Sequence, residues 1–488
     1  MKLQMNSNPD YPQSQAGQVL LIFILVLAQI LLLTKLLQDQ ERKELQKPQT
    51  LVIASLPLEQ VQAELSPYGP GFERELVQYL AKQTDLEPRW LIFDTWQDCL
   101  RAFSKGRADL LIAPGFSSPE LQDSHIRAGP EYQLHQPLLL HNKFRFGLRQ
   151  ENDICRFNIL LSQNPQLSAR LQSKAEKLQC SPELETLKTT RLQEVLELLE
   201  DNQARFGLVD SGRFRFWEPF FTDLRRTHEL GPEIPYRWYW RKDSPRLDQI
   251  LQDFWQGLQQ EPNFKRLKEL YWGFLPQNTD YYQLTHLQEA IQNRMPPYQE
   301  TILQAAEENQ LDPLFLVAMI YQESAFVTSA RSRTGVRGLL QLTQPTAREM
   351  GIQNRMDPRQ SILGGARYLK QLWDRLDSLQ VSGWDRWFLA LGAYNKGMTH
   401  VHNSISLAKK LGNDLQHWYH LKTIYPKLSY KEYYTQAPHG YARGYEVVDY
   451  VQSIRYYYYL LQGLSVLSGP EADKLAPFLV HRPRNWPD

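Results

Sequence analysis

Apolar and polar positions follow two different patterns along the chain. From Thr50 to about Gly273, short apolar runs alternate with stretches of helical spacing. Strands that alternate with helices predict a parallel α/β sheet, here in two lobes joined by crossovers with a cleft between them. The expected strands are 50–56, 88–94, 108–115, 144–149, 204–212 and 234–242, and the expected helices are 71–84, 95–107, 191–203 and 245–260.

From Asn278 onward the strand pattern stops. The remaining segments carry apolar residues at intervals of three and four, with Pro, Gly and Asp between them, which is typical of helices. The part from 278 to 488 is therefore predicted to be a mostly α-helical domain. Its expected helices are 281–295, 298–310, 313–324, 346–352, 362–376, 384–401 and 444–464.

The N-terminal region contains the longest apolar run. A short tail, 1–17, precedes Gln18–Leu37, which has no charge before Lys35 and has about the 20 residues that a membrane-spanning helix needs. A charged linker, 38–49, follows. The run lacks a small-residue cleavage site, which favours an uncleaved anchor over a cleaved export signal. Positive residues after the run would place the remainder in the cytoplasm.

Composition excludes some classes of function. Lys and Arg number 55 against 54 Asp and Glu, so the chain has no bulk positive charge that would attract nucleic acid. The three cysteines have no metal-ligand spacing, and no metal site is expected. Cys155 and Cys180 could form a disulfide in an oxidising compartment, or they could be small buried residues.

One carboxylate stands at the end of an otherwise apolar helix. Asp312 and Pro313 give a helix start signal, every residue from Leu314 to Ile320 is apolar, and Glu323 follows. Glu323 shares its helix face with Leu316, Met319 and Ile320. A carboxyl among apolar neighbours is poorly solvated as an anion, so its pKa should rise and it could serve as a general acid. The alternative is a solvated glutamate paired with Arg331, Arg333 or Arg337.

The residues downstream of Glu323 resemble the lytic transglycosylase (SLT) catalytic domain of the goose-type lysozyme superfamily. The matching residues form an ordered set over about 130 residues, which is a specific signal. Leu340 stands where many members have Met, a change that conserves volume. The set consists of Glu323–Ser324, Ser332, Gly335, Gly338–Leu342 ("GLLQL"), Ala393–Asn395 ("AYN"), Gly397 and Tyr450–Val451.

The resemblance implies roles for these residues. Glu323 would protonate the glycosidic oxygen between N-acetylmuramic acid and N-acetylglucosamine and then deprotonate the muramoyl 6-hydroxyl, which closes a 1,6-anhydro ring. No acidic residue lies between Glu323 and Glu349, which agrees with a mechanism that uses one carboxylate. No cofactor is implied. The residues expected to bind substrate or support the acid are Ser324, Ser332, Gln341, Tyr394, Asn395 and Tyr450, whereas Glu446 is expected to have a structural or salt-bridging role.

The α/β part, 50–273, resembles the family 3 periplasmic solute-binding domain. The matching stretches are Gly71–Gln83, Trp96–Ala113, Gly129–Tyr132 and Gly207–Gly212. Amino-acid-binding members have an arginine that grips the ligand carboxylate, and here that place holds Leu121. A small ligand or muropeptide, or no ligand at all, is therefore open for these lobes.

Taken together, the two domains resemble membrane-bound lytic murein transglycosylases. The expected function is non-hydrolytic cleavage of peptidoglycan strands during cell-wall remodelling, with lobes that regulate it. The catalytic domain would lie in the periplasm of a Gram-negative bacterium, either anchored to the inner membrane by the N-terminal helix or, if that helix is removed, peripheral to the outer membrane. Two alternatives are a hydrolytic lysozyme and a non-catalytic receptor that binds glycan or muropeptides.

Overall fold

The computed structural model of the protein describes residues 49–258, 261–277, 279–332, 335–413, 417–483 and 486–487. The membrane helix expected at 18–37 lies outside these residues. Among the helices that are described, none is both long enough and apolar enough to cross a bilayer.

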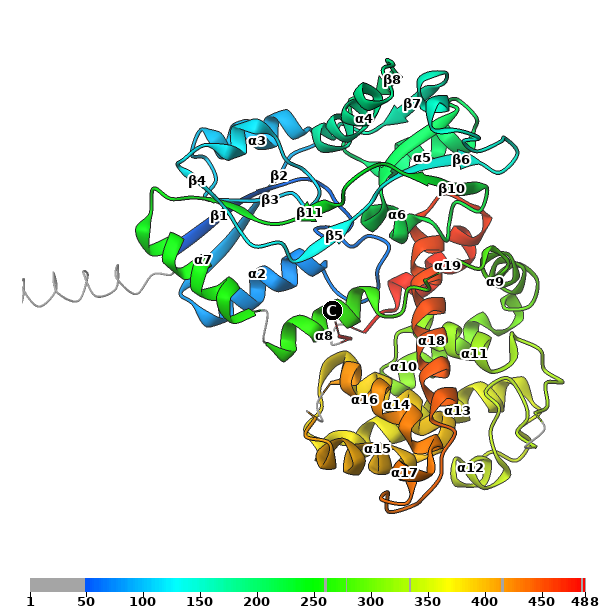
Figure 1. Cartoon of the computed structure of the whole chain (residues 1–488). Coiled ribbons are helices and arrows are strands. Elements are labelled where there is room, and N and C mark those ends of the chain that lie inside the picture. Colours follow the sequence, from blue (N-terminus) through cyan, green and yellow to red (C-terminus); the bar gives the residue numbers. More distant parts are fainter. Residues whose placement is uncertain are drawn as a thin grey trace, which may run out of the picture. The chain divides into compact units, whose positions relative to one another are not determined.

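Two five-stranded sheets form the α/β part, one in each lobe (Figure 1). The first sheet has the order β2-β1-β3-β12-β4, and the second has the order β10-β6-β9-β7-β8. The strands of the first sheet are β1 (Gln49–Ser55), β2 (Leu86–Ile92), β3 (Leu110–Ile112), β4 (Ile126–Ala128) and β12 (Tyr239–Arg241). Those of the second are β6 (Pro137–Asn142), β7 (Asn158–Leu161), β8 (Glu183–Thr186), β9 (Phe206–Asp210) and β10 (Leu224–Glu229).

Both sheets are mixed, so the prediction of parallel sheets is correct only in part. β1 pairs with β3 in parallel, as do β7 with β8 and β9, but β12 is antiparallel to β3 and β6 is antiparallel to β9. The chain passes from one lobe to the other twice, through β5 (Gln133–His135) and through β11 (Ile234–Tyr236), which pair with each other in antiparallel. The antiparallel strands β6 and β12 come directly after these two crossovers.

The predicted helices of this part are present, but one predicted strand is not. Residues 144–149 form a loop after β6, because β6 ends at Asn142, whose side-chain oxygen accepts a hydrogen bond from the Phe144 amide at 3.0 Å. The helices are α2 (Phe72–Gln83), α3 (Trp96–Ser104), α4 (Pro165–Lys177), α5 (Leu192–Glu200), α6 (Ser211–Trp217), α7 (Pro245–Leu258) and α8 (Pro262–Trp272), with 3₁₀ turns η1 (Pro119–Gln122) and η2 (Glu151–Cys155).

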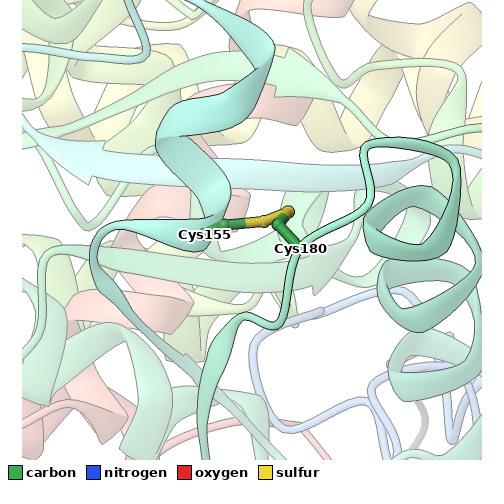
Figure 2. The surroundings of a disulfide bond; sticks show 2 residues. All are labelled: Cys155 and Cys180. Atoms are coloured by element: carbon green, nitrogen blue, oxygen red, sulfur yellow. A yellow bond between two sulfur atoms is a disulfide. The ribbon is translucent and has the colours of Figure 1, made fainter.

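A disulfide joins Cys155, at the end of η2, to Cys180 after α4 (Figure 2). Their Cα atoms are 6.0 Å apart, within the usual range for a disulfide. The third cysteine, Cys99, is buried and free. The sequence left open whether Cys155 and Cys180 form a disulfide or are small buried residues, and the structure has the disulfide.

Buried ion pairs and hydrogen bonds connect the two lobes. Arg213 of α6 forms an ion pair with Glu59 at 2.7 Å, and the Trp217 indole N–H donates to the same carboxylate at 2.8 Å. Next to these residues lies a pocket of about 30 Å³, which opens to solvent. Its lining includes Glu59, Gln62, Arg191, Gln193, Phe216 and Trp217.

The described residues after β12 are mostly helical, in agreement with the sequence, and their only β pairing is a set of isolated bridges among Arg331, Arg337 and Leu342. One predicted helix, 384–401, is two helices, because Gly397 adopts a positive φ of 89° that separates them. The helices of this part are α9 (Tyr281–Asn293), α10 (Gln299–Asn309), α11 (Pro313–Ser324), α12 (Gln344–Glu349), α13 (Pro358–Arg375), α14 (Gly383–Lys396), α15 (Met398–Lys410), α16 (Trp418–Ile424), α17 (Lys431–Tyr434), α18 (Gly444–Val466) and α19 (Pro470–Val480), with 3₁₀ turns η3 (Pro296–Tyr298), η4 (Leu376–Leu379) and η5 (Tyr425–Ser429).

Helix α18 contacts both the other helices of this part and the α/β lobes. It packs against α11 and α14 (Figure 1). Its Arg455 is fully buried and donates to the Glu269 carboxylate of α8 at 2.7 Å. The Tyr68 hydroxyl donates to the Arg455 carbonyl at 2.8 Å, and the Tyr459 hydroxyl donates to the Phe216 carbonyl. α18 is thus a shared element of the two parts.

Candidate active site

Helix α11 carries Glu323 out of the core. Asp312 caps its first turn by accepting from the amides of Leu314 at 2.7 Å and Phe315 at 3.3 Å. Asp312 is itself held by the Tyr458 hydroxyl of α18 at 2.8 Å. Every residue from Pro313 to Ile320 is buried, so α11 has no solvent face until its last turn. Glu323 therefore projects from a helix that cannot rotate without exposing its apolar residues.

The chain reverses direction immediately after Glu323. Ala325 and Phe326 both adopt positive φ angles, 46° and 61°, which are uncommon for residues other than glycine. The Ser324 hydroxyl accompanies this turn and donates to the Leu339 carbonyl at 2.9 Å. Ser324 therefore links the end of α11 to the Gly338–Leu342 turn.

The Gly338–Leu342 turn needs its glycine. Gly338 has a φ of 83°, and a Cβ atom there would lie 2.0 Å from the Arg355 carbonyl oxygen. Gln341 also has a positive φ, 44°, and its side-chain amide donates to the Gly338 carbonyl at 2.8 Å and to the Ala330 carbonyl at 3.1 Å. Gln341 thus closes its own turn.

Two side chains at the end of α14 lie next to this turn. The Tyr394 hydroxyl donates to the Leu340 carbonyl at 2.7 Å, and its ring packs against Tyr368 with centroids 5.3 Å apart. The Asn395 side-chain oxygen is buried and has no hydrogen-bond partner among the described residues. An unsatisfied buried acceptor is unusual and needs an explanation, such as a bound group.

The Glu323 carboxyl is enclosed by protein, although its side chain keeps partial access to solvent. Burial raises the pKa of Glu323 to about 7, which is the direction expected from its apolar neighbours. The Tyr450 hydroxyl of α18 donates to Glu323 Oε1 at 2.5 Å and opposes part of that rise in pKa. A carboxyl with this pKa can both give and take a proton near neutral pH.

The two tyrosines remain protonated beside the acid. Burial, followed by the charge of Glu323, raises the pKa of Tyr450 and of Tyr394 well above the ordinary value for a phenol. Their hydroxyls therefore act as hydrogen-bond donors and not as bases. Tyr450 is also 6% exposed, so its ring is fixed by packing.

Two further acids of the helical part, Glu349 and Glu446, are paired with cations. Glu349 accepts from Arg375 at 3.0 Å, and Glu446 forms ion pairs with Lys396 and with Arg443. Hydrogen bonds from Lys396 and then Arg443 lower the pKa of Glu446, in keeping with its predicted salt-bridging role. The partner described for Glu323 is Tyr450 and not an arginine. Glu323 is thus the acid here that can hold a proton at neutral pH.

Ser332 lies in the loop between α11 and the Gly338–Leu342 turn. Its amide donates to the Val336 carbonyl at 3.2 Å, and the Gly335 amide donates to the Ser332 carbonyl at 3.1 Å. These hydrogen bonds lie just before the Gly338–Leu342 turn that contains Gln341. The predicted contact of Ser332 with a sugar substituent stays a prediction.

The sequence reasoning missed two residues that organise the site. Tyr368, which packs on Tyr394, belongs to a different helix, and nothing in its local pattern distinguishes it from other core aromatics. Arg455 could have been noticed, because it is a cation within the tyrosine-rich stretch of α18. Among the described residues, no three His, Cys, Asp or Glu side chains are grouped so that they could hold a metal ion.

Comparison with known proteins gives matches to both parts of the chain. The family described as "Transglycosylase SLT domain" matches residues 300–416. A membrane-bound lytic murein transglycosylase F from Pseudomonas fluorescens is 31% identical over 417 residues, covering 85% of this chain and 84% of the relative. A protein of the same name from Shewanella pealeana is 32% identical over 446 residues, covering 89% of this chain and 90% of the relative.

Among solved structures, an ancestral arginine-binding protein bound to arginine aligns over 46% of this chain and all of its own length. The identity is 14% and the TM-score is 0.39. The substrate-binding protein of an amino acid ABC transporter aligns over 46% of this chain and 99% of its own length, with 13% identity and a TM-score of 0.39.

Proposed function

The chain belongs to the membrane-bound lytic murein transglycosylase F family and is a peptidoglycan lyase, and on this premise we propose that Glu323 alone is its acid and its base. The observation that carries the proposal is the enclosed Glu323 carboxyl, with a pKa of about 7 and one phenol donor at 2.5 Å. A protein that only bound glycan would have no need of such a group.

In the first step, protonated Glu323 donates its proton to the glycosidic oxygen between N-acetylmuramic acid and N-acetylglucosamine. The bond from C1 to that oxygen breaks, and N-acetylglucosamine leaves as an alcohol. The Tyr450 hydroxyl stabilises the carboxylate that remains, since a hydrogen bond to a charged acceptor is stronger than one to a neutral acceptor. Tyr450 thereby favours loss of the proton from Glu323 as the bond breaks.

In the second step, the Glu323 carboxylate removes the proton of the muramoyl 6-hydroxyl, whose oxygen bonds to C1 and closes the 1,6-anhydro ring. No water is consumed, and Glu323 returns to its protonated form. The contacts of the Glu323 carboxyl support this scheme, because the partner described for it is the Tyr450 hydroxyl and not a second carboxylate.

The neighbouring polar groups would orient the sugar. The unsatisfied Asn395 oxygen would accept a hydrogen bond from a substrate hydroxyl or amide. Ser332 would contact the N-acetyl or lactyl group of the muramoyl unit, and Gln341 would line the groove beside it. Tyr394 and Ser324 would act indirectly, by fixing the Gly338–Leu342 turn against α14 and α11.

Mass spectrometry of digested peptidoglycan tests the proposal against a hydrolytic lysozyme and a glycan-binding receptor. We expect soluble muropeptides that are lighter by one water than the hydrolytic products, and none from the Glu323→Gln variant. Products with hydrated ends would indicate a lysozyme, and no soluble product from the wild type would indicate a receptor. Retained activity in Glu323→Gln would refute the role of Glu323.

For the α/β lobes, we propose that a small ligand or muropeptide bound between them, at the mouth of the pocket beside Glu59 and Trp217, changes the rate of cleavage. The support is α18, which carries Tyr450 toward Glu323 and also contacts Glu269 and Phe216 of the lobes. A ligand that moved α6 or α8 would therefore also move α18, whose Tyr450 donates a hydrogen bond to Glu323.

The test measures digestion by the full chain with and without soluble muropeptides. Gln193→Trp would fill the pocket and should abolish any change in rate, while Gln203→Trp, on the exposed surface of the same lobe, should not. A rate that is unaffected by muropeptides in the wild type, or affected equally in both variants, would contradict the proposal.

We also propose that the predicted helix 18–37 tethers the chain and that the rest lies in the periplasm. The names of the relatives include "membrane-bound". The Cys155–Cys180 disulfide supports the periplasmic side over the cytoplasmic side that the distribution of positive residues favours, because disulfides persist in oxidising compartments. N-terminal sequencing of the purified protein tests whether the helix is retained.

A further inference from the structure

The loop between β6 and η2 exposes two phenylalanine rings to solvent. Phe144 is 76% exposed and Phe146 is 71% exposed, far more than is usual for large apolar side chains. In the sequence they resemble alternate positions of a strand, but the structure gives them no sheet partner and no core. Their exposure therefore has no explanation within the fold.

The loop is held in a fixed shape, so the rings do not face solvent through lack of structure. Its backbone accepts and donates defined hydrogen bonds at both ends. The Phe144 amide donates to Asn142 Oδ1, and the Leu148 amide donates to the Thr227 hydroxyl, each at 3.0 Å. The Arg145 guanidinium donates to the Asn202 carbonyl at 3.2 Å, and Arg205 donates to the Phe146 carbonyl.

Cations surround the exposed rings. The Lys143 ammonium lies 5.0 Å from the Phe144 ring centroid, and the Arg149 guanidinium lies 4.7 Å from that of Phe146. We refer to the group as the basic-aromatic patch. It consists of Lys143, Phe144, Arg145, Phe146, Arg149 and Arg205.

Most of this positive charge is not neutralised. Lys143 forms an ion pair with Asp223 at 2.5 Å, but Arg145, Arg149 and Arg205 have no ion pair among the described residues. Burial, together with the charges of Arg145 and Arg149, lowers the pKa of Arg205, and the charge of Asp153 opposes this only in part. The patch therefore combines protruding apolar rings with a local excess of cations.

We propose that the basic-aromatic patch docks onto an anionic phospholipid bilayer. Phenyl rings that protrude from a fixed loop can enter the boundary between headgroups and acyl chains, while Lys and Arg side chains contact the phosphates. The binding of glycan at Glu323 does not require exposed phenyl rings next to cationic side chains.

A bilayer is within reach of the patch-bearing domain. The predicted anchor ends at Leu37 and β1 begins at Gln49, and an extended chain of that length spans at most about 40 Å. The anchor alone would leave the domain free to take any orientation allowed by the linker. Contact between the patch and the headgroups would restrict that orientation.

Hydrogen–deuterium exchange of the full chain in lipid nanodiscs tests the proposal. We expect amides of residues 143–149 to exchange roughly tenfold more slowly in discs containing phosphatidylglycerol than in discs of phosphatidylcholine alone, as for a site occupied about nine-tenths of the time. High salt should remove this protection, because it screens the attraction between the cations and the phosphates.

Two variants determine whether the patch itself is responsible. Arg145→Glu combined with Arg149→Glu should abolish the protection, and Phe144→Ser combined with Phe146→Ser should weaken it. The matched control, Arg348→Glu combined with Arg359→Glu, makes the same change of charge at exposed positions of the helical domain and should keep the protection. Thermal unfolding of each variant verifies that it is folded.

Equal exchange in the two kinds of disc would overturn the proposal. So would protection that persists in the charge-reversal variant, since that would indicate an apolar contact such as a second copy of the chain. Protection that appears only when peptidoglycan is added, and not with anionic lipid, would also overturn it and would assign the patch to glycan.

Discussion

Replacing Glu323 by glutamine should make the protein more stable at neutral and alkaline pH while abolishing its activity. Glu323 is a carboxyl whose pKa rises from an ordinary 4.5 to about 7 on folding, chiefly through burial. The folded chain therefore binds this proton more tightly than the unfolded chain does. At about 1.4 kcal/mol per pH unit, the difference corresponds to about 3 kcal/mol.

The sign of the effect follows from which state holds the proton. Below pH 4.5 both states are protonated and Glu323 imposes no penalty. Between pH 4.5 and about 7 only the folded state keeps the proton, so the stability of the wild type falls as the pH rises, and by about pH 8 the full amount is lost. The amide in Glu323→Gln has no proton to lose, so the variant avoids this fall.

The assay compares the thermal unfolding midpoints of the wild type and of Glu323→Gln from pH 4.5 to 8. Because other groups titrate equally in both proteins, the difference in midpoint isolates Glu323. For a domain of this size, about 3 kcal/mol should increase that difference by roughly 6 to 12 °C across the range. The same variant should bind peptidoglycan sacculi but release no soluble product.

Glu446→Gln is the matched control. The pKa of Glu446 is lowered by Lys396 and Arg443, so its contribution to stability is lost as the pH falls, and the control should be slightly less stable than the wild type at neutral pH. A difference between the wild type and Glu323→Gln that stays flat from pH 4.5 to 8 would refute the enclosed acid on which the mechanism depends.

Three further substitutions test other contacts. Tyr450→Phe removes the donor that lowers the pKa of Glu323, so the alkaline limit of kcat/KM should move to higher pH and its maximum should fall about 10- to 100-fold, as a pH–rate profile would reveal. An unchanged alkaline limit would contradict that contact. Arg455→Ala removes a fully buried guanidinium and leaves the Glu269 carboxylate with Lys422 alone, so it should cost about 3 kcal/mol in chemical denaturation, whereas a loss below about 1 kcal/mol would contradict the buried pair. Cys155→Ser opens a loop with a sequence separation of 25 and should cost about 3 kcal/mol, measured as a lower unfolding midpoint that added reductant does not lower further; equal midpoints for the variant and the oxidised wild type would count against the disulfide.

The helix that carries Glu323 could be predicted from sequence to the residue. Asp312, Pro313 and the apolar run fix its start and its burial by local rules, and the structure has α11 at Pro313–Ser324 as expected. The same local rules failed at 144–149, because alternating phenylalanines fit a half-buried strand equally well. Only the end of β6 at Asn142 decides between the two, and that depends on contacts outside the segment.

The residues of the candidate site could be named from the sequence, but the contacts between them could not. Tyr450 could be named as a neighbour of Glu323 only through resemblance to a family, because 127 residues separate them in the chain. The pair of Arg455 and Glu269, separated by 186 residues, has no motif at all and was missed. Local spacing indicates the chemistry that is available, whereas long-range packing determines which groups meet.

Helix α18 limits how freely the two halves of this protein could be exchanged during evolution. A catalytic half cut away from its lobes would present the charged Arg455 and the hydroxyl of Tyr459 to water along a surface shaped to receive α8 and α6. Such a fragment would need compensating changes in this helix before it could work alone. An unrelated domain in place of the lobes would likewise need acceptors for the buried Arg455 guanidinium, such as those that Glu269 provides. The two halves are therefore expected to be inherited together.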